Sequence, residues 1–175
     1  MLFRSREDIQ KFCLKMRNHG SDKRSCHSYG FNSRLDDIHA GILSVKLRHI
    51  TNWTDRRREI AARYTAGLKD SGLDLPYEPA GYRHAFHLYV IEVDNRDACE
   101  KFLIERGVDA KTHYPIAIHK QEGYPWGKDA APNPKVPNCE RNASRCISLP
   151  MFPELTNEEV DYTISQVLEW VKAKK

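Results

Sequence analysis

The spacing of apolar residues predicts three main helices in this chain. The first is a short amphipathic helix that follows Ser5 and stops before Gly20, with Asp8 placed to complete a capping box. The second is one long helix from about Leu35 to Leu68, because this segment carries a broad apolar stripe. The third runs from about Asn157 to Lys172 behind a T-x-x-E capping box. The stripe of the long helix includes Ile38, Ile42 and Val45.

Two short segments have the β-branched and aromatic residues that favour strands. They are His87–Val93 and Cys146–Leu149. Between them, a further helix is expected to begin at Asp94 or Asn95. Residues 121–142 combine Gly, Pro, Asn and charge with little periodicity, which predicts a long irregular loop. The fold class is therefore α+β, with the long helix packed on a small, mainly antiparallel sheet and the C-terminal helix completing the layer.

Composition narrows the class of protein. The chain of 175 residues is 40% hydrophobic and 30% charged, with a mean hydropathy of -0.68, which excludes a membrane protein and a disordered chain. Its 28 basic and 24 acidic residues give a net charge of +4, which permits an anionic small-molecule ligand at least as readily as nucleic acid. The first residues have no hydrophobic signal region, which predicts a cytoplasmic location. The five cysteines have no C-x-x-C spacing and are expected to be reduced thiols.

General motifs identify no reaction. The sequence has no Gly-rich phosphate loop before a helix, no H-E-x-x-H and no G-x-S-x-G. His84 and His87 are close enough in sequence to share a metal, but near the start of a strand their rings would point to different faces. A metal site also needs three or four ligands. We therefore interpret both histidines as structural and predict no metal site.

Five longer motifs follow one another in an order typical of one enzyme family. They are R-N-H-G at Arg17–Gly20, G-x-N-x-R at Gly30–Arg34, H-x-F-H-x-Y at His84–Tyr89, Y-P-x-x-x-H-x-Q at Tyr114–Gln121 and S-L-P-x-F-P-x-x-T at Ser148–Thr156. With these motifs the chain resembles the C-terminal portion of the DegT/DnrJ/StrS family of pyridoxal-phosphate-dependent aminotransferases. The resemblance implies transfer of an amino group to keto-sugar nucleotides.

The resemblance also implies how the chain is organised. It implies the small C-terminal domain of a fold type I aminotransferase, with residues 1–34 forming a helix and loop that continue from a missing large domain and residues 35–175 forming the α+β domain. No lysine lies in the context of the family's Schiff-base lysine, and the acidic partner of the pyridine nitrogen is also missing. We therefore expect a truncated chain that is inactive alone. It would need the missing large domain or a partner subunit, and a homo-oligomer is expected.

Two residues are candidates for binding the cofactor, pyridoxal phosphate. The resemblance implies that Asn32 reaches the cofactor phosphate of the partner subunit and that Arg34 helps to place an anionic group. An asparagine amide before a helix can donate to a phosphate that the positive helix end also attracts. From residue types alone, the alternative is that Asn32 caps the helix and Arg34 is solvated or ion-paired.

Three residues are candidates for binding the sugar nucleotide. The resemblance implies that His119 lines the substrate site near the sugar or its diphosphate, and Tyr114 and Gln121 are weaker candidates. The alternative for His119 is a structural histidine, since most histidines have no catalytic or binding role. The identity of the sugar does not follow from the sequence.

Three classes of function stay open. The first is the C-terminal segment of a sugar-nucleotide aminotransferase, of the kind used in polysaccharide biosynthesis. The second is a stand-alone regulatory or binding module derived from the same family. The third is a decayed fragment that folds and dimerises without activity. The ordered motifs favour the first.

Overall fold

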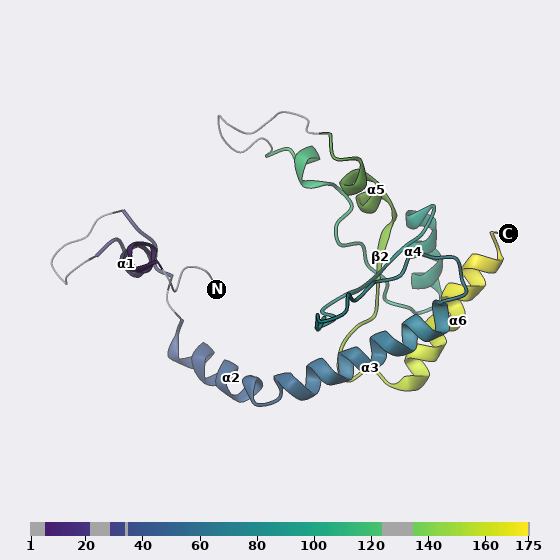
Figure 1. Cartoon of the computed structure of the whole chain (residues 1–175), viewed down its shortest axis with the longest axis horizontal. Coiled ribbons are helices and arrows are strands. Elements are labelled where there is room, and N and C mark those ends of the chain that lie inside the picture. Colours follow the sequence, from purple (N-terminus) through teal and green to yellow (C-terminus); the bar gives the residue numbers. More distant parts are fainter. Residues whose placement is uncertain (1–5, 22–28, 34, 124–134, 175) are drawn as a thin grey trace. The chain divides into compact units, whose positions relative to one another are not determined.

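The computed structural model describes residues 6–21, 29–33, 35–123 and 135–174 (Figure 1). The chain divides into two compact units, Met1–His49 and Ile50–Lys175. This division lies further along the chain than the boundary at residue 34 that the sequence indicated. That residues 1–34 continue from a large domain stays a prediction.

The first unit contains the helices α1 (Glu7–Met16) and α2 (Asp37–Leu47). The predicted capping box of α1 is wrong, because Arg6 is the N-cap residue and no side chain caps this end. Instead, Asp8 accepts a hydrogen bond of 2.7 Å from the guanidinium group of Arg6. Ser5 lies outside the described residues.

The predicted long helix is two helices. α2 ends at Leu47, and α3 (Ile50–Leu68) begins after a break at Arg48 and His49. At the break the amide of Arg48 donates to the carbonyl of Val45, three residues back, as in a 3-10 turn. The apolar pattern continues across the break, but no described residue of α2 is buried, and the stability of a helix in a protein comes mainly from packing rather than from the pattern alone. Three residues of the predicted apolar stripe are exposed on α2: Ile38, Ile42 and Val45.

The second unit is built on a two-stranded antiparallel sheet. β1 (Tyr89–Glu92) pairs with β2 (Cys146–Leu149), so Tyr89 lies opposite Leu149 and Ile91 lies opposite Ile147. These four side chains are buried. Both strands were predicted, although the first is shorter than the predicted segment 87–93. Alternation along β1 turns Val90 and Glu92 to the other face of the sheet.

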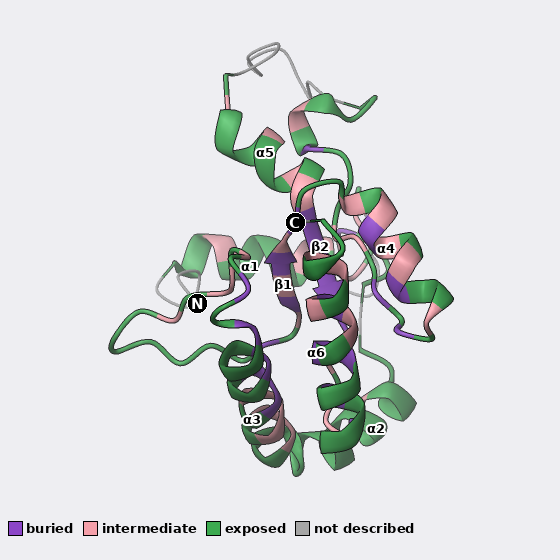
Figure 2. Cartoon of the chain, turned by 90° about the vertical axis from the view of Figure 1, so that its right-hand side faces the viewer, coloured by how far each residue is buried: buried purple, intermediate pink, exposed green. Residues whose placement is uncertain are grey.

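Three helices bury one face of the sheet (Figure 2): α3, α4 (Arg96–Glu105) and α6 (Asn157–Lys172). α3 and α6 pack closely because Gly67 has no side chain, and a Cβ there would lie 2.8 Å from Ile164 of α6. The core contributed by these helices comprises Ile60, Tyr64, Leu68, Cys99, Leu103, Val160, Ile164 and Val167.

The start of α6 confirms the predicted capping box. The amide of Glu159 donates to the Thr156 hydroxyl at 3.2 Å, and the amide of Thr156 donates to the Glu159 carboxylate at 2.8 Å. This satisfies two backbone amides at the helix start. Within the described residues, no helix is long and apolar enough to cross a membrane.

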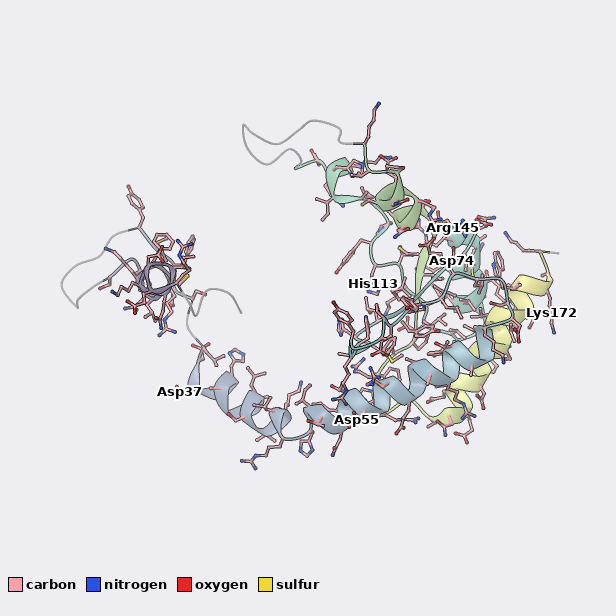
Figure 3. The ribbon with its side chains drawn as sticks, viewed as in Figure 1. Asp37, Asp55, Asp74, His113, Arg145 and Lys172 are labelled. Atoms are coloured by element: carbon pink, nitrogen blue, oxygen red, sulfur yellow. The ribbon has the colours of Figure 1, made fainter. Side chains whose placement is uncertain are left out.

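The predicted loop 121–142 is wrong in its last part, because α5 (Pro137–Arg145) begins there. Proline at the first position of a helix loses no hydrogen bond, since that amide has no partner within the helix. α5 ends beside β1, and Figure 3 labels Arg145 at this end close to Asp74. The guanidinium nitrogens of Arg145 are 3.3 Å from Asp94, 3.6 Å from Glu92 and 3.7 Å from Asp74. Residues 124–134 lie outside the described part of the chain.

Candidate functional site

Asn32 belongs to a backbone pairing that joins the first two motifs. It lies opposite Asn18 in an isolated antiparallel bridge. The amide of Phe31 donates to the carbonyl of Met16 at 2.7 Å, and the amide of Ser33 donates to the carbonyl of Arg17 at 2.9 Å. Asn32 itself is exposed. Its side chain is therefore accessible on a segment whose backbone is fixed on both sides.

The structure changes the expected relation between Asn32 and the helix that follows. The N-cap residue of α2 is Asp36, so the alternative that Asn32 caps this helix is wrong. The first residue of α2 is Asp37, which places two carboxylates at the helix start. The carboxylates of the first turn already interact with the positive end of the helix dipole. The predicted phosphate contact therefore depends on the side-chain amide of Asn32 and not on the helix end. Arg34 lies outside the described residues.

His119 lies in the short 3-10 helix η2 (Ile118–Lys120) and is held by α5. Its Nε2 is 3.0 Å from the carboxylate of Glu140. Lys120 donates to the other oxygen of the same carboxylate at 2.9 Å. Hydrogen bonds from Lys120 and then His119 lower the pKa of Glu140 below its ordinary value, since both stabilise its ionised form. The side chain of His119 is only 7% exposed, so it does not project into solvent.

The other two substrate candidates differ in how firmly they are held. Tyr114 is 73% exposed. Gln121 donates from its side-chain amide to the carbonyl of Ile116 at 3.1 Å. This bond closes the turn that contains η2, so Gln121 has a structural contact in addition to any contact with a ligand.

A cavity of about 490 Å³ lies where the segment before η2 meets α5 and the sheet. This volume is in the range of small-molecule sites. Its polar lining includes His113 and Asn142, and its apolar lining includes Ile116. Tyr114 also lines it, but His119 and Gln121 do not. The structure thus brings one of the three substrate candidates to the cavity and places the other two beside it along the chain.

Two residues near this cavity were not predicted from the sequence. His113 has its Nδ1 2.9 Å from the hydroxyl of Ser148, which is buried in β2. Glu140 binds His119, although the sequence placed it in an irregular loop. Pro137 followed by an acidic residue within one turn is a helix-start signal that would have located Glu140 on a helix. The contact with His119 depends on tertiary structure and has no local signal.

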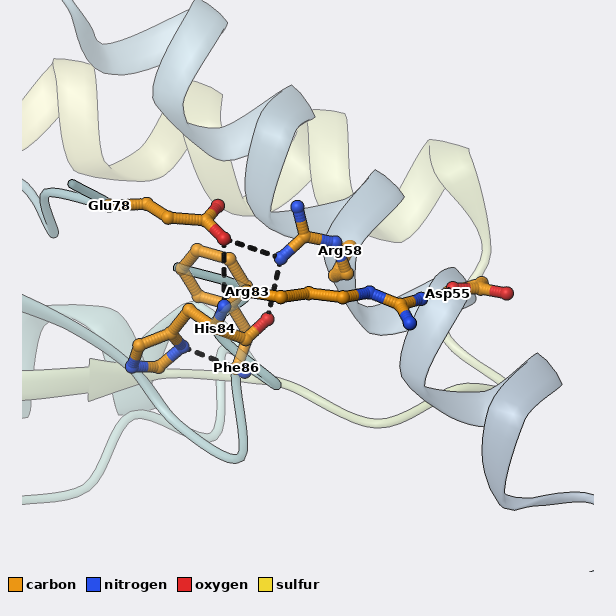
Figure 4. A network of polar contacts seen from close by, with 6 residues as sticks. All are labelled: Asp55, Arg58, Glu78, Arg83, His84 and Phe86. Atoms are coloured by element: carbon orange, nitrogen blue, oxygen red, sulfur yellow. Dashed lines mark hydrogen bonds and ion pairs between the residues drawn. The ribbon is translucent and has the colours of Figure 1, made fainter. Parts of the chain in front are cut away.

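A second polar network fixes the loop that carries the H-x-F-H-x-Y motif (Figure 4). Arg58 of α3 donates to the carboxylate of Glu78 at 2.8 Å and to the carbonyl of His84 at 2.7 Å. The amide of His84 also donates to Glu78, at 2.7 Å. Arg83 forms an ion pair with Asp55. The network therefore anchors this loop to α3 at two residues of the helix, Asp55 and Arg58.

The two histidines of the motif lie in this loop. Nδ1 of His84 accepts a hydrogen bond of 2.8 Å from the amide of Phe86, so this nitrogen has a structural partner. Among the described residues, no three side chains are placed to hold a metal ion together.

The fold matches part of solved aminotransferase structures. It superposes on S. venezuelae DesV, whose structure was determined in complex with a ketimine intermediate, with a TM-score of 0.85 and 32% identity. The match covers 94% of this chain and 44% of that chain. This confirms the predicted α+β class and the small C-terminal domain of a fold type I aminotransferase.

The sequence comparison gives the family. The profile of the DegT/DnrJ/EryC1/StrS aminotransferase family matches residues 1–168, and the chain belongs to this family. It is 34% identical, over 90% of its length, to the dTDP-3-amino-3,4,6-trideoxy-alpha-D-glucose transaminase of Streptomyces venezuelae. It is 36% identical, over 98% of its length, to the "Pleiotropic regulatory protein" of Geobacillus stearothermophilus. The chain spans 41% and 47% of these two relatives, less than half of each.

Proposed function

We propose that this chain is the C-terminal part of a pyridoxal-phosphate-dependent aminotransferase that acts on keto-sugar nucleotides. The observation that carries the proposal is the pairing of the motifs around Asn18 and Asn32, which exposes the Asn32 side chain on a fixed backbone. Family membership and the name of the Streptomyces venezuelae relative, a transaminase of a dTDP-sugar, support it.

The described residues fit one part of the cofactor, its phosphate. The exposed amide of Asn32 can donate to a phosphate oxygen, and we propose Arg34 as a second, positively charged contact. Pyridoxal phosphate, when bound, supplies the electron sink that amino transfer requires. We propose that no lysine of this chain takes the place of the family's Schiff-base lysine, and that the part of the site that binds the aldehyde comes from a large domain. We propose that the chain is inactive without it.

The apolar residues of α2 bear on how the chain assembles. Ile38, Ile42 and Val45 of α2 are 78%, 53% and 54% exposed. Exposed apolar residues on one helix are typical of protein contact surfaces. We propose that they are covered by the large domain or by a second subunit, and that the enzyme is a homo-oligomer in which Asn32 serves the cofactor of the neighbouring subunit.

We propose that the segment from Tyr114 to Gln121 binds the sugar nucleotide. The cavity of about 490 Å³ beside this segment supports this assignment. Tyr114 would contact the ligand from the cavity wall, and His119 would contact it near the diphosphate. Gln121 would hold the turn that contains η2 and would contact the sugar nucleotide at the edge of its binding site.

A regulatory module is the second candidate function. The name of the Geobacillus stearothermophilus relative favours it. A regulator that binds DNA would lose affinity steeply as salt rises, since it would release counterions from the phosphates. An aminotransferase domain would show no such binding.

One experiment separates the two candidates. The chain is fused behind the large domain of a family aminotransferase, and transfer of an amino group from an amino-acid donor to a dTDP-linked keto-sugar is measured. We expect activity from the fusion and none from the chain alone. Salt-sensitive DNA binding by the chain, together with an inactive fusion that binds pyridoxal phosphate, would favour the regulatory module.

A further inference from the structure

The carboxylate of Glu140 lies between two basic side chains of η2. One oxygen is 3.0 Å from Nε2 of His119, and the other accepts from Nζ of Lys120 at 2.9 Å. Both oxygens of the carboxylate are therefore used, and the two bonds join η2 to the first turn of α5. Because these partners lower the pKa of Glu140, the group is a carboxylate at neutral pH.

This contact determines which nitrogen of His119 carries a proton. An ionised carboxylate only accepts hydrogen bonds, so the ring nitrogen that faces it, Nε2, must be protonated. In the neutral ring, Nδ1 then keeps its lone pair. In the charged ring, Nδ1 is a second donor. In either state, a ligand that forms a hydrogen bond with the ring would have to use Nδ1, because Nε2 is occupied by Glu140.

Burial limits the freedom of the ring. The side chain of His119 is 7% exposed, whereas that of Lys120 is 55% exposed. A buried ring held at one nitrogen keeps one orientation. Lys120 also balances the charge of Glu140, so the carboxylate does not add net negative charge beside a phosphorylated ligand.

We propose that Glu140 is a positioning residue for the substrate site. It holds the imidazole of His119 with Nε2 toward α5 and leaves Nδ1 as the atom that contacts the sugar nucleotide. The inference rests on the proposed role of His119 in substrate binding. It adds that this role depends on a residue of α5 that does not itself touch the substrate.

The first test uses the chain itself, labelled with ¹⁵N at histidine and studied by NMR. We expect a proton on Nε2 of His119 that exchanges slowly with water, and no proton on Nδ1 at a pH where the ring is neutral. Glu140→Ala should abolish the slow exchange. Glu140→Gln keeps an acceptor oxygen and should retain it. Glu122→Ala removes an equal charge close to η2 along the chain and should leave the His119 signals unchanged.

Two results would overturn the positioning of the ring. One is a neutral His119 with its proton on Nδ1. The other is an Nε2 proton that exchanges equally slowly in Glu140→Ala.

The second test concerns the substrate and uses the fusion with a family large domain. We expect Glu140→Ala to raise the KM for the sugar nucleotide about ten-fold and to leave pyridoxal phosphate affinity unchanged, with Glu140→Gln closer to wild type. The double variant with His119→Ala should be no worse than His119→Ala alone, since Glu140 acts through His119.

The two proposals fail in different ways. If His119→Ala leaves the KM unchanged, the substrate role of His119 is wrong, whatever the NMR result. If His119→Ala raises the KM and Glu140→Ala does not, the substrate role stands and the positioning role of Glu140 is wrong.

Discussion

Asn32 lies opposite Asn18 in an antiparallel bridge that joins two motifs of the sequence. The motifs can approach this closely because Gly30 has no side chain. A Cβ at Gly30 would lie 2.1 Å from the backbone nitrogen of Gly20 and 2.8 Å from the carbonyl oxygen of Met16. Atoms cannot approach that closely, so the pairing of the two motifs requires a glycine at position 30.

We therefore expect Gly30→Ala to open this pairing. The amide of Phe31, which donates to Met16 at 2.7 Å, should exchange with solvent much faster than in the wild-type chain. Hydrogen exchange followed by NMR measures this directly. Residues of α3 and α6, in the second compact unit, should keep their protection.

Gly41→Ala is the matched control for this substitution. Gly41 lies in α2, and a Cβ there meets no atom within 4 Å. Alanine favours a helix over glycine by about 1 kcal/mol, so α2 should become more protected. Equal loss of Phe31 protection in both variants would show that Gly30 has no special role.

Local signals predicted the fold where one short segment decides the structure. The capping box of Thr156 and Glu159 located the start of α6, and β-branched and aromatic residues located β1 and β2. The break between α2 and α3 was missed, because the apolar stripe continues through His49 and only packing distinguishes the two helices.

The candidate site shows the same limit. Motifs placed His119 and Tyr114 in one segment, and the cavity beside that segment is lined by Tyr114 but not by His119. Glu140 was missed because its bonds to His119 and Lys120 cross from α5 to η2. Contacts between elements far apart in sequence leave no periodic pattern that a single sequence can show.

Asn32 and His119 should affect different steps of the proposed reaction. In the fusion with a family large domain, Asn32→Ala should weaken pyridoxal phosphate binding about ten-fold to a hundred-fold, since a hydrogen bond to a charged group contributes about 1.5 to 3 kcal/mol. His119→Ala should instead raise the KM for the sugar nucleotide or lower kcat. Cofactor titration and steady-state kinetics measure the two effects separately. Unchanged cofactor affinity in Asn32→Ala would remove the phosphate contact.

The exposed apolar residues of α2 should cause self-association of the chain. Ile38 is 78% exposed and Ile42 is 53% exposed. Replacing both with lysine removes apolar surface and adds charge, so sedimentation should show a larger monomer fraction at the same concentration. Replacing Tyr77, which is 82% exposed in the second unit, with lysine is a control for added charge. An equal shift in both variants would argue against a specific role of α2.

The ion pair of Glu78 should make stability depend on pH in the acid range. The hydrogen bond from Arg58, and then that from the His84 amide, lower the pKa of Glu78 in the folded chain. A lowered folded pKa stabilises the fold above the unfolded pKa, and this contribution is lost as pH falls through the folded value. The wild-type chain should therefore have a higher Tm than Glu78→Gln at neutral pH, and the difference should shrink below about pH 4. A difference in Tm that stays constant down to pH 3 would contradict the linkage.

The described cysteines are free, and they should differ sharply in reactivity. Burial raises the pKa of Cys99 to about 12, whereas Cys13 and Cys139 are exposed. The thiolate is the reactive form, so at pH 8 Cys99 should be modified on the order of a thousand-fold more slowly than an exposed thiol of ordinary pKa. The measurement is alkylation of the folded chain over time, mapped by mass spectrometry in a Cys26→Ser background, because Cys26 lies outside the described residues. Denaturation should bring Cys99 to the rate of the exposed thiols. If Cys99 reacts as fast as Cys13 before denaturation, the core formed by α3, α4 and α6 opens far more often than its packing implies.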